Sequence, residues 1–314
     1  MKNSLLSQLE AFNSRENQGL AHEITCKRCF IHFFQPQLIS AYDAPSLNAV
    51  LTVAATIGYV DFFKVLQKRQ RADSAEMLVN FKAPLLNTGV TAAHIAAQVG
   101  HISLLQWLSE EADVDLKAKT TAGWTAAHLA AYGGHVEVLT WLESQGVDMK
   151  VRDNLGATTA HWAAEGGQIH VLSWLTLRDI DVKARSSEGW TTAHWAAFGG
   201  HVDAIAWLKE EGVDLREVSN QGWTTAHMAA FGGQVKVLEA LKEEGIDFSA
   251  ENANGATTAH LAAEAGHLGV LQWLVGEGVD LTAKTTAGKT PQMFAHDNGH
   301  MEVASWLKQH SLGA

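Results

Sequence analysis

The stretch GWTAAHLAAYGGHVEVLTWLESQGVD, residues 123–148, returns along the rest of the chain with small changes. The leading glycines are 34 residues apart once and 33 residues apart five times. A fixed period of this size predicts a solenoid, in which each unit buries its apolar face only against its neighbours. Clear copies begin at Gly156, Gly189, Gly222 and Gly255, another begins upstream at Gly89, and a degraded one begins at Gly288.

Within one unit the sequence predicts two helices and a loop. Thr125 is a suitable N-cap for a short first helix, because its hydroxyl can satisfy an N–H group of the first turn. The glycines at 133–134 then break the chain, and residues 135–144 form a second helix. Gly146 ends that helix in a left-handed conformation. Residues 147–155 return to the next unit as an extended, hairpin-like loop.

The domain organisation follows from where this pattern fades. Residues 1–46 lie outside the repeat, and their apolar spacing predicts a helical N-terminal cap. Residues 47–85 are a degenerate repeat, in which Thr52 takes the place of the histidine, followed by an insertion. Residues 86–314 hold seven repeats, the last of which is a C-terminal cap.

The frame G-x-T-x-x-H-x-A-A-x-x-G-H, repeated every 33 residues, closely resembles the ankyrin repeat family. The resemblance implies an all-α solenoid of helix-turn-helix units with hairpin loops. It also implies protein binding on a concave face formed by the loops and first helices, without catalytic residues or a cofactor. The chain departs from the family frame, since only Thr290-Pro291 keeps the usual threonine-proline pair.

A second departure concerns core volume. Alanine replaces the leucine of the family frame in the first helices, whereas tryptophan occupies a second-helix position that is usually aliphatic. Because cores tolerate changes that conserve total volume, we infer that these tryptophans compensate for the small alanines. The unit that starts at Gly222 has alanine at both positions, Ala226 and Ala240, which predicts a looser core there.

The composition restricts the classes of partner that the chain can bind. The net charge is −11, and nine basic and seven acidic residues fall in residues 1–85, which leaves −13 for residues 86–314. An acidic array repels nucleic acid and anionic membranes, and no apolar run approaches the roughly 18 residues of a membrane span. With two cysteines there is no disulfide framework. We expect a soluble, cytoplasmic monomer with a protein partner.

Sixteen histidines invite a metal or catalytic interpretation, but six of them hold one fixed position in the first helix. The family resemblance implies that this set orders the loops through hydrogen bonds with threonine and the backbone. A repeat spreads these imidazoles apart, whereas a metal needs several converging ligands, so we expect no metal site. The six are His94, His128, His161, His194, His227 and His260.

Cys26 and Cys29 allow three interpretations. With His22 and His32 they have the ligand types of a zinc site, and a C-x-x-C pair or a thiol beside histidine also suits redox or nucleophilic chemistry. On a helix, both thiols would share one face with Phe30, which is ordinary burial. An N-terminal thiol enzyme or zinc module in residues 1–85 is therefore an alternative function.

The residue after each leading glycine and the residue eight positions later change together. Both positions lie on the concave face by family resemblance, so we predict a partner-binding site of aromatic rings set among carboxylates. The alternative is that paired rings stiffen the scaffold. The aromatic pairs are Trp124 with Tyr132, Trp190 with Phe198, and Trp223 with Phe231; Glu165 and Glu264 replace the second ring where Ala157 and Ala256 replace tryptophan.

These features predict a non-enzymatic scaffold for protein–protein interaction. A partner segment with apolar anchors and some Lys or Arg suits the predicted face. Because ankyrin repeats recur in effectors of intracellular bacteria, a second hypothesis is an effector that acts on a host protein in the host cytosol.

Overall fold

The computed structural model describes residues 44–72 and 79–310. Cys26, Cys29 and nearly all of the predicted N-terminal cap lie outside these residues. In the described part the chain forms 16 α-helices, and β-pairing is limited to an isolated bridge between Arg152 and Thr158. The predicted all-α repeat architecture is confirmed.

The chain divides into two compact units. The first unit comprises residues 1–130 and 140–147, and the second comprises residues 131–139 and 148–314. The helices that lie wholly or partly in the first unit begin with the degenerate repeat, which forms a helix pair like the others, and the division passes through both α8 and α9. They are α4 (Ala44–Thr56), α5 (Val60–Ala72), α6 (Ala92–Val99), α7 (Ile102–Glu110), α8 (Ala126–Gly133) and α9 (Val136–Ser144).

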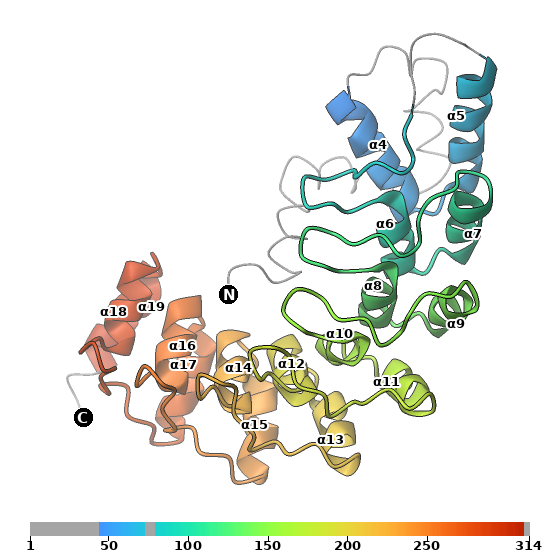
Figure 1. The fold of residues 1–314 in the computed structure, drawn as a ribbon. Coiled ribbons are helices and arrows are strands. Elements are labelled where there is room, and N and C mark those ends of the chain that lie inside the picture. The colour runs from blue at the N-terminus through green and yellow to red at the C-terminus, as the bar shows by residue number, and fades with distance from the viewer. Residues whose placement is uncertain (1–43, 73–78, 311–314) are drawn as a thin grey trace. The chain divides into compact units, whose positions relative to one another are not determined.

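The second unit continues the alternation of first and second helices. First helices pack against the next first helices, and each packs against the second helix of its own repeat. Figure 1 shows α10, α12 and α14 in one row and α11, α13 and α15 in another. The helices are α10 (Thr159–Glu165), α11 (Ile169–Thr176), α12 (Thr192–Gly199), α13 (Val202–Glu210), α14 (Thr225–Phe231), α15 (Val235–Glu243), α16 (Thr258–Ala265), α17 (Leu268–Gly276), α18 (Pro291–Asp297) and α19 (Met301–His310).

Alanines let the first helices approach one another closely. Ala193, Ala226 and Ala259 are completely buried, as are Leu208, Leu241 and Leu274 of the second helices. Between the two helices of a repeat, glycine leaves room for a side chain of the next repeat. Gly233, for example, has φ of 77°, and a Cβ atom there would lie 2.8 Å from the imidazole of His267.

Candidate partner-binding face

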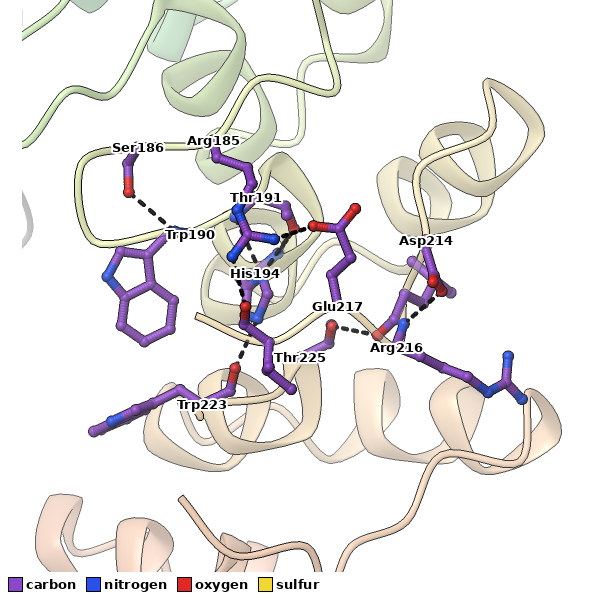
Figure 2. Close-up of polar contacts among 12 residues, drawn as sticks. Arg185, Ser186, Trp190, Thr191, His194, Asp214, Arg216, Glu217, Trp223 and Thr225 are labelled. Carbon is purple, nitrogen blue, oxygen red and sulfur yellow. Dashed lines mark hydrogen bonds and ion pairs between the residues drawn. The ribbon is translucent and has the colours of Figure 1, made fainter. Parts of the chain in front are cut away.

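A ladder of threonine and histidine side chains begins the clear first helices, and in α10, α12 and α14 it also fixes the loop that follows. In the repeat drawn in Figure 2, the backbone N–H of Thr191 donates to Nδ1 of His194 at 3.2 Å. The opposite ring nitrogen, Nε2, lies 3.0 Å from the carbonyl oxygen of Trp223 in the next repeat. Because Nδ1 accepts a hydrogen bond, the ring is neutral and its Nε2–H donates.

The same contact recurs in the neighbouring repeats. Nε2 of His161 lies 3.0 Å from the carbonyl oxygen of Trp190, and Nε2 of His227 lies 3.0 Å from that of Ala256. Burial lowers the pKa of His161, His194 and His227 to about 4. Their predicted structural role is therefore supported by geometry, and the rings stay uncharged at neutral pH.

The hairpin loops are tied to themselves and to each other. Ser186 N–H donates to the carbonyl of Trp190 at 2.9 Å, and its hydroxyl oxygen accepts from Trp190 N–H at 3.0 Å. Asn220 N–H donates to the carbonyl of Glu188 in the preceding loop at 2.9 Å. An ion pair between Arg185 and Glu217 adds a link at the surface. The loops therefore hold the residues at their bases in fixed positions.

The structure corrects the predicted exposure of the loop-base tryptophans. Trp124 is only 4% exposed and Trp190 only 7%, so neither presents a free surface for a partner. Trp190 does not pair with Phe198 as predicted; its indole contacts the indole of Trp223 edge-on, with centroids 5.5 Å apart. Figure 2 shows these two rings on the same side of the loops. At these two positions, aromatic residues serve the scaffold.

The remaining predicted rings are half-buried, and three of them, Phe198, Trp223 and Phe231, come together. Trp223 lies edge-on to Phe231 of its own repeat, with centroids 6.1 Å apart, as the sequence predicts. Phe231 also stacks on Phe198 of the preceding repeat at 6.2 Å and an interplanar angle of 27°. Adjacent first helices thus place aromatic rings in a row.

Glu165 and Glu264 differ in exposure, although the sequence predicts the same role for both. Glu264 is half-buried, whereas Glu165 is only 5% exposed. Burial, together with the nearby carboxylate of Asp153, raises the pKa of Glu165 to about 8. Glu165 is therefore largely protonated at neutral pH, and the prediction of a surface carboxylate at this position is wrong.

Family comparison agrees with this geometry. A family model of ankyrin repeats (three copies) matches residues 51–153, 94–186, 160–252 and 246–314. The chain belongs to the ankyrin repeat family. Ankyrin repeats typically bind other proteins and generally lack enzymatic activity, so the membership favours a scaffold for protein–protein interaction. No curated protein matches the chain.

Sequence reasoning missed two tryptophans of these ankyrin repeats. Trp162 and Trp195 follow the ladder histidines directly, where the other clear repeats carry Ile, Leu or Met. Their rings lie 5.6 Å apart, and Tyr132 contacts Trp162 edge-on at 6.3 Å. Trp162 is buried, whereas Tyr132 and Trp195 remain partly exposed. The repeated pair His-Trp at 161–162 and 194–195 was the available signal.

The predicted loose core beneath α15 is also wrong. Val237, Leu238 and Leu241 of that helix are completely buried, so the core there is closed. Ala240 instead is partly exposed and lines a surface groove. At the equivalent position the sister repeats carry tryptophan, which is buried in Trp107 and Trp174 and half-buried in Trp207 and Trp273.

The described residues also bear on metal-dependent and membrane-bound classes of function. Within residues 44–72 and 79–310, no three His, Cys, Asp or Glu side chains lie together so that they could hold a metal ion. None of the helices described is both long and apolar enough to span a membrane.

Proposed function

We propose that the chain is a non-enzymatic scaffold that binds a partner protein through the first helices of the second unit. The stack of Phe198 on Phe231 supports this most strongly, because both rings are half-buried and stand at equivalent positions of adjacent repeats. Large rings that are held rigidly but not covered are typical anchors of protein interfaces. The aromatic face consists of Tyr132, Trp195, Phe198, Trp223 and Phe231.

The surroundings indicate the chemistry of the partner. Residues 86–314 carry a net charge of −13, and Glu264 lies half-buried on the first helix that follows Phe231. A partner segment that presents apolar side chains between Lys or Arg residues would match both features. The uncharged ladder histidines do not oppose such a segment at neutral pH.

A paired substitution tests this assignment. The double variant Phe198→Ala, Phe231→Ala removes the stack while it leaves the buried Trp190 in place. Trp207→Ala is the matched control, because Trp207 is also half-buried but lies on the second helix α13. Interface anchors of this kind contribute about 2 kcal/mol or more each, so the double variant should bind its partner at least about 100-fold more weakly.

The measurement is affinity capture from lysate followed by titration of the captured protein against each folded variant. The expected result is capture by the wild type and the Trp207 variant, with loss in the Phe198, Phe231 variant. Equal affinity for all three proteins would contradict the assignment. Circular dichroism establishes that each variant retains its helices.

The hypotheses about an effector role, a cytoplasmic location and an N-terminal module remain predictions. An effector role in a host cell and a cytoplasmic location rest on the sequence resemblance and on composition. The N-terminal thiol or zinc module depends on Cys26 and Cys29, outside the described residues. A zinc-binding assay on the full chain, compared with the variant Cys26→Ser, Cys29→Ser, tests the module directly.

A further inference from the structure

A groove of about 670 Å³ lies among the second helices, away from the aromatic face. Its walls come from the start of α13 and from one side of α15, and its apolar surface includes Ile169, Val202 and Ala240. This volume falls within the range of small-molecule and side-chain binding sites. We call it the Ala240 groove.

One residue of the groove stands where the neighbouring repeats carry an indole. Position 240 is in register with tryptophans 33 residues away on either side, Trp207 and Trp273. In the neighbouring repeat, Trp273 packs edge-on against Phe248 with centroids 5.1 Å apart. Beneath Ala240 the core is complete, since Leu238 and Leu241 are fully buried. The interior is therefore closed here, and Ala240 contributes only a methyl group to the wall of the groove.

The side of α15 that faces the groove is acidic. Lys236, Glu239, Ala240 and Glu243 stand at positions i, i+3, i+4 and i+7, so they share one side of the helix, and all four line the groove. Asp203 adds a third carboxylate from the first turn of α13. Against one lysine, three carboxylates leave a net charge of −2.

The three carboxylates of the groove have no ionic partner among the described residues. The ion pairs of this region use Lys209 with Glu244 and Lys242 with Glu277. In the part of the chain that the structure describes, Asp203, Glu239 and Glu243 form no ion pair, and all three are exposed. Glu239 and Glu243, four residues apart on one helix, also repel each other, which a bound cation would relieve.

We propose that the Ala240 groove docks a basic segment of a partner protein, whose aromatic side chain takes the place of the missing indole. The apolar surface contacts the ring, and flanking Lys or Arg side chains pair with the carboxylates of Glu239, Glu243 and Asp203. This surface lies on the second helices, so it is a second contact region in addition to the aromatic face. Its presence does not depend on whether the aromatic face binds a partner.

The probe is a five-residue peptide with a central tryptophan flanked by lysines, added to the full chain. A matched peptide has glutamates in place of lysines. Nuclear magnetic resonance of backbone amides locates each peptide on the protein. We expect the lysine peptide to shift the amide resonances of Gly200, Val202 and Ala240, and the glutamate peptide to leave them unchanged.

Two variants separate the contribution of the peptide's aromatic ring from that of the carboxylates of the groove. Ala240→Trp restores the residue of the sister repeats and fills the groove, so it should weaken binding of the lysine peptide at least tenfold. Ala206→Trp is the control, because Ala206 is exposed on α13 and does not line the groove. Glu239→Gln with Glu243→Gln keeps the shape and should also weaken binding at least tenfold, a result that does not require the tryptophan variant to fold.

Four results would overturn the proposal. The first is the absence of shifts with the lysine peptide, and the second is equal binding by the wild type and the folded Ala240→Trp variant. The third is equal binding of the two peptides, which would leave no role for the carboxylates. The fourth is self-association of the wild type that Ala240→Trp abolishes in sedimentation, since that would assign the groove to a second copy of the chain.

Discussion

Acid should unfold this protein through its ladder histidines. His161, His194 and His227 have a pKa of about 4 in the folded chain, against an ordinary value of 6.5. The added proton would go to Nδ1, where a threonine backbone N–H already donates a hydrogen bond. Protonation of each ring therefore opposes folding by about 3 kcal/mol.

The direction in which stability changes with pH follows from the number of protons bound by the folded and the unfolded chain. Between pH 6.5 and pH 4 the unfolded chain binds protons at these three histidines and the folded chain does not, so stability falls as pH falls. Glu165 acts in the opposite direction, because its folded pKa of about 8 lies above the ordinary 4.5. About two more protons are thus bound on unfolding, and the free energy of unfolding should drop by at least about 2 kcal/mol from pH 6 to pH 5.

Guanidinium unfolding, followed by circular dichroism at a series of pH values, measures this slope. His94 and His260, whose pKa values are also lowered by burial, can only steepen it. A free energy of unfolding that changes by less than about 1 kcal/mol over the same pH interval would refute the neutral, buried ladder. The variant Glu165→Gln is the internal control, because removal of the opposing carboxyl should steepen the slope by about 1 kcal/mol per pH unit.

Four single substitutions probe the scaffold. Glu165→Gln should raise the free energy of unfolding at pH 7 by about 3 kcal/mol, because the folded chain no longer needs to protonate a carboxyl; a decrease in chemical denaturation would contradict the buried acid. Gly233→Ala should destabilise by more than about 1 kcal/mol through its left-handed backbone and the nearby ring of His267, whereas Gly269→Ala, with open space around it on α17, should stabilise by about 0.5–1 kcal/mol. Equal melting shifts for the two glycine variants would disprove this reasoning. Thr191→Ala should lower the free energy of unfolding by about 1 kcal/mol through loss of the helix cap, and an unchanged denaturation midpoint would exclude that role.

Periodicity predicted the fold because it records a local and repeated physical requirement. Each unit needs a capped first helix, a glycine break and a second helix, and the residues for all three recur in register. The predicted left-handed Gly146 and the hydrogen bonds of the ladder histidines are both present. Even the degenerate copy around Thr52 forms a helix pair, since Ala54 and Ala55 keep the close approach of the first helix.

Burial at the candidate face was harder to predict because it depends on the neighbouring repeat. Trp190 is covered partly by Trp223, which lies 33 residues further along, whereas Trp223 is followed at the same register by the small Ala256. A pattern within one unit contains no information on this contact. The burial of Glu165 could not be predicted from the pattern of one helix either, since its environment includes Asp153 from the preceding loop.

The footprint of the captured partner on the chain tests the central claim most directly. Hydrogen–deuterium exchange of the complex should show protection of α12 and α14, the first helices that carry Phe198 and Phe231. Protection confined to the second helices α13 and α15, with α12 and α14 unchanged, would contradict binding through the aromatic face.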